Sequence, residues 1–173
     1  MKKLLLFILV CAPGIVSAQR KSIGALEIVP IVNGRIVYTE IDTASGTKDE
    51  LYNRAKIFLS SVFPNFSNVV KLDDKELGSV RIRGIFNTLD NSKKGMIISY
   101  LEFYAIVDIQ VKDGRYKYEI SDFTQSDTGY PLEATMYNRK RIMKVSKEMA
   151  PYMNNFVHAL KIAMAGKSAQ NNW

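Results

Sequence analysis

The side chains that could carry out acid–base chemistry near neutral pH are few in this sequence. Histidine is the commonest general base in that range, and His158 is the only histidine among 173 residues. A His-Glu-x-x-His metal motif needs two histidines. A Ser-His-acid triad would have to use His158, but no serine stands in a Gly-x-Ser-x-Gly elbow. We therefore expect His158 to be a partly exposed helix residue and predict no catalytic residue of this kind.

Cofactor and metal motifs are missing from the sequence as well. The glycines form neither a Gly-x-Gly-x-x-Gly turn nor a phosphate-binding loop. Asp122 and Asp127 flank a loop that lacks the alternating oxygen ligands and the central glycine of a calcium-binding loop. The sequence therefore predicts no cofactor and no metal ion.

Paired carboxylates are the chemistry that sequence spacing excludes least well, because the two acids can come from distant strands. Glu102 and Asp108 lie in one long apolar segment, and their equal parity places them on the same face of a strand. Either could be a functional acid in a groove. The simpler interpretation is the solvated outer face of a one-sided sheet, so a carboxylate-based enzyme ranks third among the functions considered.

The C-terminal segment carries a stripe of flexible apolar side chains at helical spacing. Methionine is unbranched and polarizable, so such a stripe could line a groove for an apolar ligand or a partner helix. Packing of an amphipathic helix against a sheet would give the same pattern. The residues of this methionine stripe are Met149, Met153, Phe156, Leu160 and Met164.

A basic cluster precedes that stripe. Its cations would attract phosphate or carboxylate polymers in a salt-dependent way, and Arg81 and Arg83 could add a basic sheet face. A solvated helix face is the alternative interpretation. The cluster consists of Arg139, Lys140, Arg141, Lys144 and Lys147.

The N-terminus has the three parts of a cleavable export signal. Lys2 and Lys3 supply positive charge, and residues 4–10 form an unbroken apolar run. A membrane-spanning helix needs about 20 residues, so this run can insert but not anchor. Small side chains follow, and we predict cleavage between Ala18 and Gln19.

Removal of residues 1–18 changes the chemistry that remains. The only cysteine, Cys11, is lost, which leaves no thiol and no disulfide. The 24 basic residues become 22 against 17 acidic residues, so the formal charge is +5. The rest suits one domain, residues 19–165, followed by a flexible polar tail at 166–173. We expect it in the periplasm or outside the cell.

Changes in hydrophobic period predict the elements of that domain. Two β-branched runs, 26–32 and 35–41, flank the turn dipeptide Asn33-Gly34, and Pro30 limits the first run to a sheet edge or excludes it from a sheet. Thr47 and Glu50 form a capping box for a helix that ends by residue 64. Further strands are predicted at 69–72, 79–88, 96–111 and 115–124, the last two joined by a second hairpin turn.

The last element is a helical segment over residues 138–165. Pro151 cannot donate its amide hydrogen and collides with the preceding turn, so we predict a break near Ala150. Helices on either side of a strand meander normally cover one face of a single sheet. The predicted fold class is therefore α+β with two layers.

Four segments have a combination of residues seen elsewhere. They are Asn33-Gly34-Arg35-Ile36-Val37-Tyr38, Thr47-Lys48-Asp49-Glu50-Leu51-Tyr52, Leu77-Gly78-Ser79-Val80 and Lys112-Asp113-Gly114-Arg115-Tyr116-Lys117-Tyr118. Together they resemble an exported Bacteroidota family of unknown function with a TATA-binding-protein-like fold. The resemblance implies a curved antiparallel sheet in the order β-α-β4-α. It implies no activity, and a fold name does not imply DNA binding.

The sequence thus favours a non-enzymatic envelope protein that binds another protein or an anionic envelope component, with peripheral membrane association as one form of that binding. An apolar-ligand carrier, with the ligand between the sheet and the C-terminal helix, is the alternative. Nucleic acid is not an expected partner, because exported proteins rarely meet it.

Overall fold

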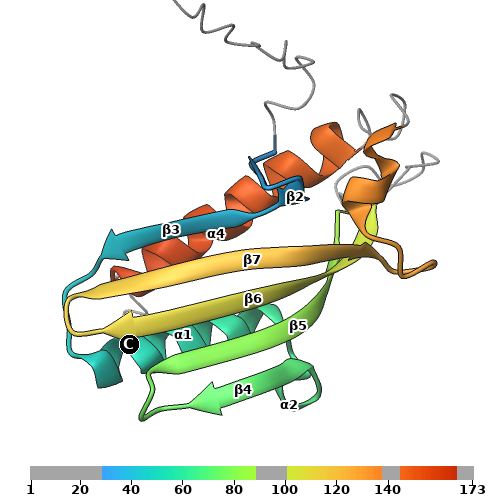
Figure 1. The fold of residues 1–173 in the computed structure, drawn as a ribbon. Helices are drawn as coiled ribbons and strands as arrows, with labels where there is room; N and C mark the ends of the chain where they lie inside the picture. Colours follow the sequence, from blue (N-terminus) through green and yellow to red (C-terminus); the bar gives the residue numbers. More distant parts are fainter. Residues whose placement is uncertain (1–28, 89–100, 138–144, 167–173) are drawn as a thin grey trace, which may run out of the picture.

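The protein is built on a five-stranded antiparallel sheet that carries its two long helices on one face (Figure 1). This computed structural model describes residues 29–88, 101–137 and 145–166. The strand order is β3-β7-β6-β5-β4, and the helices are α1 (Lys48–Val62) and α4 (Ala150–Met164). The predicted two-layer α+β class is confirmed. The strands are β3 (Tyr38–Thr43), β4 (Val70–Asp74), β5 (Ser79–Asn87), β6 (Glu102–Lys112) and β7 (Arg115–Gln125).

The predicted hairpin around Asn33-Gly34 forms, but its strands are short. Both turn residues have positive φ, 50° and 77°, as a two-residue hairpin loop requires. Strands β1 (Ile31–Val32) and β2 (Arg35–Ile36) pair only with each other. The continuous strand predicted over 35–41 was wrong, because the Val37 amide turns back to the Pro30 carbonyl (3.1 Å). The chain joins the main sheet only from β3 onward.

Helix α1 begins as the capping box predicts. The Thr47 hydroxyl accepts from the Glu50 amide, and the Glu50 carboxylate accepts from the Thr47 amide. Leu51, Ala55 and the following apolar positions of the same stripe are buried against the sheet. The helix ends at Val62, which is exposed.

The register between β6 and β7 has an irregularity that was not predicted. Strand β7 has an extra residue where its register with β6 shifts between Tyr104 and Ile106. Tyr116, Tyr118 and Ile120 face the helices as their spacing predicts. Unbroken alternation along the strand predicted over 115–124 would place Asp122 on that face too, which is wrong. Asp122 has φ 54° and is exposed, and Phe123 takes the next buried position. A β-bulge of this kind re-aims one side chain and bends the strand.

The C-terminal helix packs its methionine stripe into the core. A π-helical turn, Val145–Met149, gives way to α4 at Ala150, with Pro151 in the first turn. The predicted break near Ala150 is therefore confirmed as a change of helix type. Two short elements were not predicted from the sequence, namely α2 (Phe66–Val69) and a 3₁₀ segment (Leu132–Tyr137).

A polar contact fixes α1 against strand β4. The Asp73 carboxylate accepts from the Lys56 ammonium (2.7 Å) and from the Tyr52 hydroxyl. These two hydrogen bonds hold the pKa of Asp73 below its ordinary value. Burial, with help from Asp73, raises the pKa of Tyr52 to about 12. Asp73 therefore stays ionised and Tyr52 stays protonated over the whole neutral pH range.

This contact predicts a pH dependence of stability. A carboxylate whose pKa is lowered by folding stabilises the folded state fully at pH values above its pKa in the unfolded chain, about 3.9. This stabilisation is lost as the pH falls through the pKa in the folded protein. We expect the urea midpoint of Asp73→Asn to fall less than that of wild type between about pH 5 and pH 3. Asp49→Asn is the matched control, because both partners of its pair with Lys75 are more than half exposed. If the urea midpoints of wild type and Asp73→Asn fell equally between about pH 5 and pH 3, the stabilising role of the Asp73 carboxylate would be contradicted.

Candidate functional site

Neither α1 nor α4 covers the second face of the sheet, which carries alternate residues of every strand (Figure 1). In β5, Arg81, Arg83 and Ile85 are exposed, whereas Val80 and Ile82 are buried, as the alternation predicts. In β6, burial alternates without interruption, so Glu102 and Asp108 share the open face, as their parity predicts. We call this surface the open face.

Strand register brings basic residues together at one end of the open face. Lys112 of β6 is paired with Arg115 of β7. The next row toward the middle of the sheet contains Ser79, Gln110, Lys117 and Ile41, one from each of four adjacent strands. Since neighbouring strands lie about 4.8 Å apart, these side chains lie beside one another although they are far apart in sequence.

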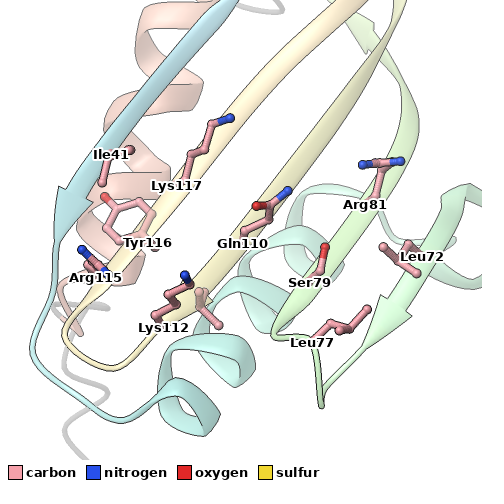
Figure 2. Close-up of a pocket in the computed structure, with 11 residues that line it drawn as sticks. Ile41, Leu72, Leu77, Ser79, Arg81, Gln110, Lys112, Arg115, Tyr116 and Lys117 are labelled. Atoms are coloured by element: carbon pink, nitrogen blue, oxygen red, sulfur yellow. The ribbon is translucent and has the colours of Figure 1, made fainter.

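A hollow of about 560 Å³ occupies this end of the open face (Figure 2). Four cations line it and no carboxylate does; the cations are Arg81, Lys112, Arg115 and Lys117. Its walls include two unusually exposed aliphatic side chains, Ile41 (69%) and Leu77 (71%). We call this hollow the basic groove. Its lining residues are Ile41, Leu72, Leu77, Ser79, Arg81, Gln110, Val111, Lys112, Arg115, Tyr116 and Lys117.

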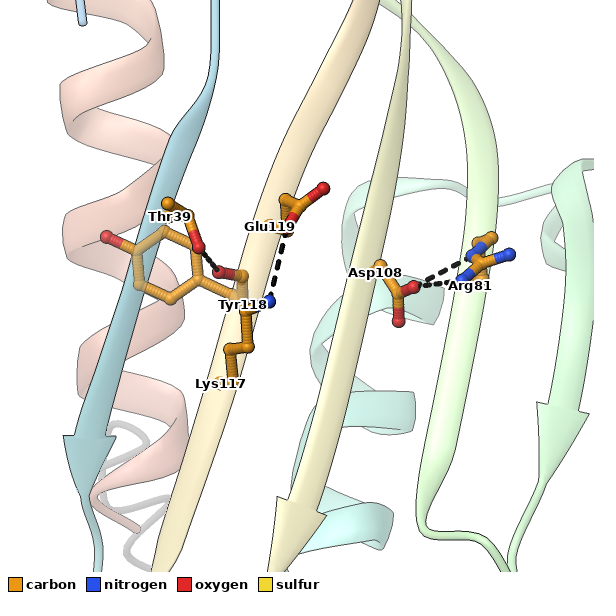
Figure 3. Close-up of polar contacts among 6 residues, drawn as sticks. All are labelled: Thr39, Arg81, Asp108, Lys117, Tyr118 and Glu119. Carbon is orange, nitrogen blue, oxygen red and sulfur yellow. Dashed lines mark hydrogen bonds and ion pairs between the residues drawn. The ribbon is translucent and has the colours of Figure 1, made fainter. Parts of the chain in front are cut away.

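Two of the four cations have carboxylate partners at the groove's edge (Figure 3). Arg81 donates to Asp108, whose side chain is 12% exposed, through Nε (2.8 Å) and a second nitrogen. Lys117 pairs with Glu119 at 3.2 Å, and both side chains are more than 40% exposed. Because it is exposed, the pair between Lys117 and Glu119 contributes little to stability and can open to a ligand.

The other two cations have no ion-pair partner among the described residues. Lys112 and Arg115 flank the hairpin turn that contains Asp113. The Asp113 carboxylate accepts instead from the Lys48 amide at the start of α1 (2.6 Å). A helix N-terminus favours negative charge, so the Asp113 carboxylate binds the start of α1 and forms no ion pair with Lys112 or Arg115. The basic groove thus keeps two cations that form no ion pair within the described part of the chain.

The structure places the predicted binding residues in several regions. Met149, Met153, Phe156, Leu160 and Met164 are all buried in the core. Of the basic cluster, Lys147 is exposed, whereas Arg139, Lys140, Arg141 and Lys144 lie outside the described residues. So do Ala18, Gln19 and the predicted signal. His158 is exposed on α4, as expected.

Sequence reasoning missed three of the four cations of the groove, Lys112, Arg115 and Lys117. The Lys-Asp-Gly-Arg turn predicted a hairpin, and strand alternation from Arg115 would have placed Lys117 on the face of Arg115. Within the described residues, no group of three or more His, Cys, Asp or Glu could hold a metal ion. No helix in the described ranges has the length and apolar character to cross a membrane.

A match to a protein-family model shows which family the chain belongs to. Residues 38–126 match the model described as a domain of unknown function (DUF4468) with TBP-like fold. The chain belongs to the DUF4468 family. The match runs from β3 to the end of β7, so it includes α1 and every residue of the basic groove, whereas α4 lies beyond it. The predicted resemblance to a family of this fold is confirmed.

Two solved structures are similar to this chain in fold. A DUF4468 family protein from Bacteroides ovatus superposes with a TM-score of 0.63 at 14% identity, covering 80% of this chain and 91% of its own. A TBP-like protein from Parabacteroides distasonis gives a TM-score of 0.62 at 14% identity, covering 79% and 97%. At this identity the likeness shows the fold alone. No curated protein matches the chain in sequence.

Proposed function

We propose that this DUF4468 protein is an exported, non-enzymatic binding module of the cell envelope, and that its basic groove binds phosphate-bearing lipid headgroups. The observation that supports the proposal is the lining of the groove, which has four cations, no carboxylate and two exposed aliphatic walls. Cations at this density attract anions in a salt-dependent way.

The aliphatic walls favour a lipid over a soluble polyanion. A soluble polyanion would pair with Lys112 and Arg115 but would leave Ile41 and Leu77 in water. Burial of apolar surface contributes about 25 cal/mol per Å², so a ligand with both an anionic head and an apolar part gains from both features. Arginine also presents a planar fork of donors that matches phosphate oxygens.

The methionine stripe is not where we place the ligand. Its five side chains are buried in the core between the sheet and the helices, so packing accounts for their spacing. Two carboxylates of the open face are engaged in ion pairs, since Asp108 binds Arg81 and Glu119 binds Lys117. These contacts favour a binding role for the open face over catalysis.

A charge variant of the groove tests the proposal. Each basic residue near an anionic surface contributes about 1 kcal/mol. We therefore expect Lys112→Gln with Arg115→Gln to weaken binding to vesicles of phosphatidylcholine and phosphatidylglycerol by about 2 kcal/mol, or about 30-fold. Vesicle co-sedimentation at low salt measures it. Wild type should lose most of its binding as salt rises, because the charges are screened.

The matched control removes the same charge elsewhere. Lys71 and Lys75 are exposed and lie outside the lining of the groove. Lys75 forms only a weak, exposed pair with Asp49, so Lys71→Gln with Lys75→Gln should retain most of the binding. Leu77→Ser tests the apolar wall and should weaken vesicle binding without affecting soluble polyglutamate. An equal loss in the two charge variants contradicts the proposal. So does binding of polyglutamate as tight as binding of vesicles, which would indicate an acidic protein partner instead.

A further inference from the structure

A second hollow, of about 280 Å³, lies on the open face farther from the hairpin turn. Four charged side chains from four different elements line it. They are Arg35 of β2, Arg83 of β5, Asp122 of β7 and Glu133 of the 3₁₀ segment. Two guanidinium groups and two carboxylates cancel in net charge, in contrast to the basic groove.

The bulge in β7 creates part of this site. The extra residue of the bulge turns Asp122 from the helix face to the open face. Asp122 has a positive φ (54°), which residues other than glycine adopt rarely. Bulges and unusual backbone conformations are concentrated beside binding sites, where they aim one side chain. Asp122 meets Arg35 at 3.4 Å, with the two side chains 51% and 72% exposed. A pair so exposed is weak and opens readily to a ligand.

Arg83 is held in place but keeps free donors. One terminal nitrogen donates to the Thr124 hydroxyl at 3.1 Å, and the guanidinium lies 4.9 Å from the centre of the Tyr104 ring. These contacts fix the plane of the guanidinium. Its Nε and other terminal nitrogen have no partner among the described residues, so a fork of two donors stays available for a carboxylate.

Glu133 supplies an acceptor across the same hollow. Its Oε1 accepts from the Ile36 amide at 2.8 Å, which holds the side chain in position. Its Oε2 has no hydrogen bond within the described chain. Ile106 and Pro131 add an apolar wall.

We propose that this hollow binds the zwitterion of an α-amino acid. The ligand's carboxylate sits on the Arg83 fork, its ammonium lies between Asp122 and Glu133, and its side chain lies toward Ile106. The charge pattern carries the assignment, since a ligand with both charges can pair its carboxylate with Arg83 and its ammonium with Asp122 and Glu133 while the net charge of the site stays zero. The volume of about 280 Å³ lies just below the lower end of the range for ligand pockets, about 300 Å³, and so suits only a small ligand. The inference is independent of lipid binding in the basic groove.

Titration monitored by backbone amide NMR tests it with four free amino acids, glycine, leucine, glutamate and lysine, up to about 10 mM. We expect at least one to shift the amides of Arg83, Asp122 and Thr124. For that amino acid, the N-acetyl derivative and the carboxamide should each bind at least about tenfold more weakly, because each loses one charge-assisted contact. If none of the four shifts these amides, or if either derivative binds equally well, the proposal is overturned.

Variants of the site give a second readout. Asparagine tolerates the positive φ of Asp122, so Asp122→Asn removes the charge and keeps the bulge; it should weaken binding at least about tenfold. Arg83→Gln should do the same. The groove variant, Lys112→Gln with Arg115→Gln, should bind the amino acid as wild type does. Wild-type affinity in Asp122→Asn, with an unchanged amide spectrum elsewhere, would overturn the proposal.

Discussion

Phe86→Ala is expected to lower the free energy of unfolding by about 3–5 kcal/mol. Phe86 is 1% exposed and lies at the centre of an aromatic cluster between β5, β6 and the helices. Its ring centre is 5.3 Å from Phe63, 5.5 Å from Phe103 and 5.3 Å from Phe156. Truncation leaves a cavity that these large rings cannot close, so the lost contacts add to the lost burial.

Urea unfolding followed by circular dichroism measures this loss. Phe86→Leu keeps most of the apolar volume and should cost clearly less than Phe86→Ala. The neighbouring residue on the open face provides the control, since Ile85 is exposed and Ile85→Thr should change stability by no more than about 0.5 kcal/mol. Equal losses for Phe86→Ala and Ile85→Thr would show that the cluster does not hold the layers together.

Gly84→Val is expected to destabilise the fold by about 3 kcal/mol, at the upper end for overpacking. A Cβ atom at Gly84 would lie 2.7 Å from Cζ of Phe63 and would overlap the rest of that ring edge. The ring cannot move aside, because it packs edge-on against Phe86 at an interplanar angle of 84°. Gly84 therefore sets how closely the end of α1 approaches β5.

A double variant separates this clash from a general intolerance of valine in β5. Phe63→Leu removes the ring edge that the new side chain meets. In that background, Gly84→Val should cost at least about 1 kcal/mol less than in wild type, which is the coupling expected of residues in direct contact. Strictly additive losses, measured by urea unfolding of all four proteins, would contradict the contact.

Local elements of this protein could be predicted from sequence because short-range chemistry determines them. The Thr47 and Glu50 capping box, the Asn33-Gly34 turn and the alternation of β5 depend on neighbours a few residues away. The same holds for the break at Ala150, where the proline ring acts on its own preceding turn. The two-layer class followed from the order of these elements.

The β7 bulge and the short β1–β2 hairpin could not be predicted in this way. Strict alternation from Tyr116 placed Asp122 on the helix face, and the extra residue that reverses it is visible only against the register of β6. The strand predicted over 35–41 ended early because the Val37 amide bonds the Pro30 carbonyl and the Ile36 amide bonds Glu133, almost a hundred residues away. Such competition between partners depends on tertiary contacts.

The candidate sites show the same division. The sequence by itself determined that Glu102 and Asp108 share a face, that histidine and thiol chemistry is scarce, and that a methionine stripe lies along the last helix. Only the tertiary structure decided that this stripe is core and that Lys112, Arg115, Lys117 and Arg81 line one groove. The physical reason is that burial and charge density depend on which strands become neighbours, and strand order arises from packing across the whole domain.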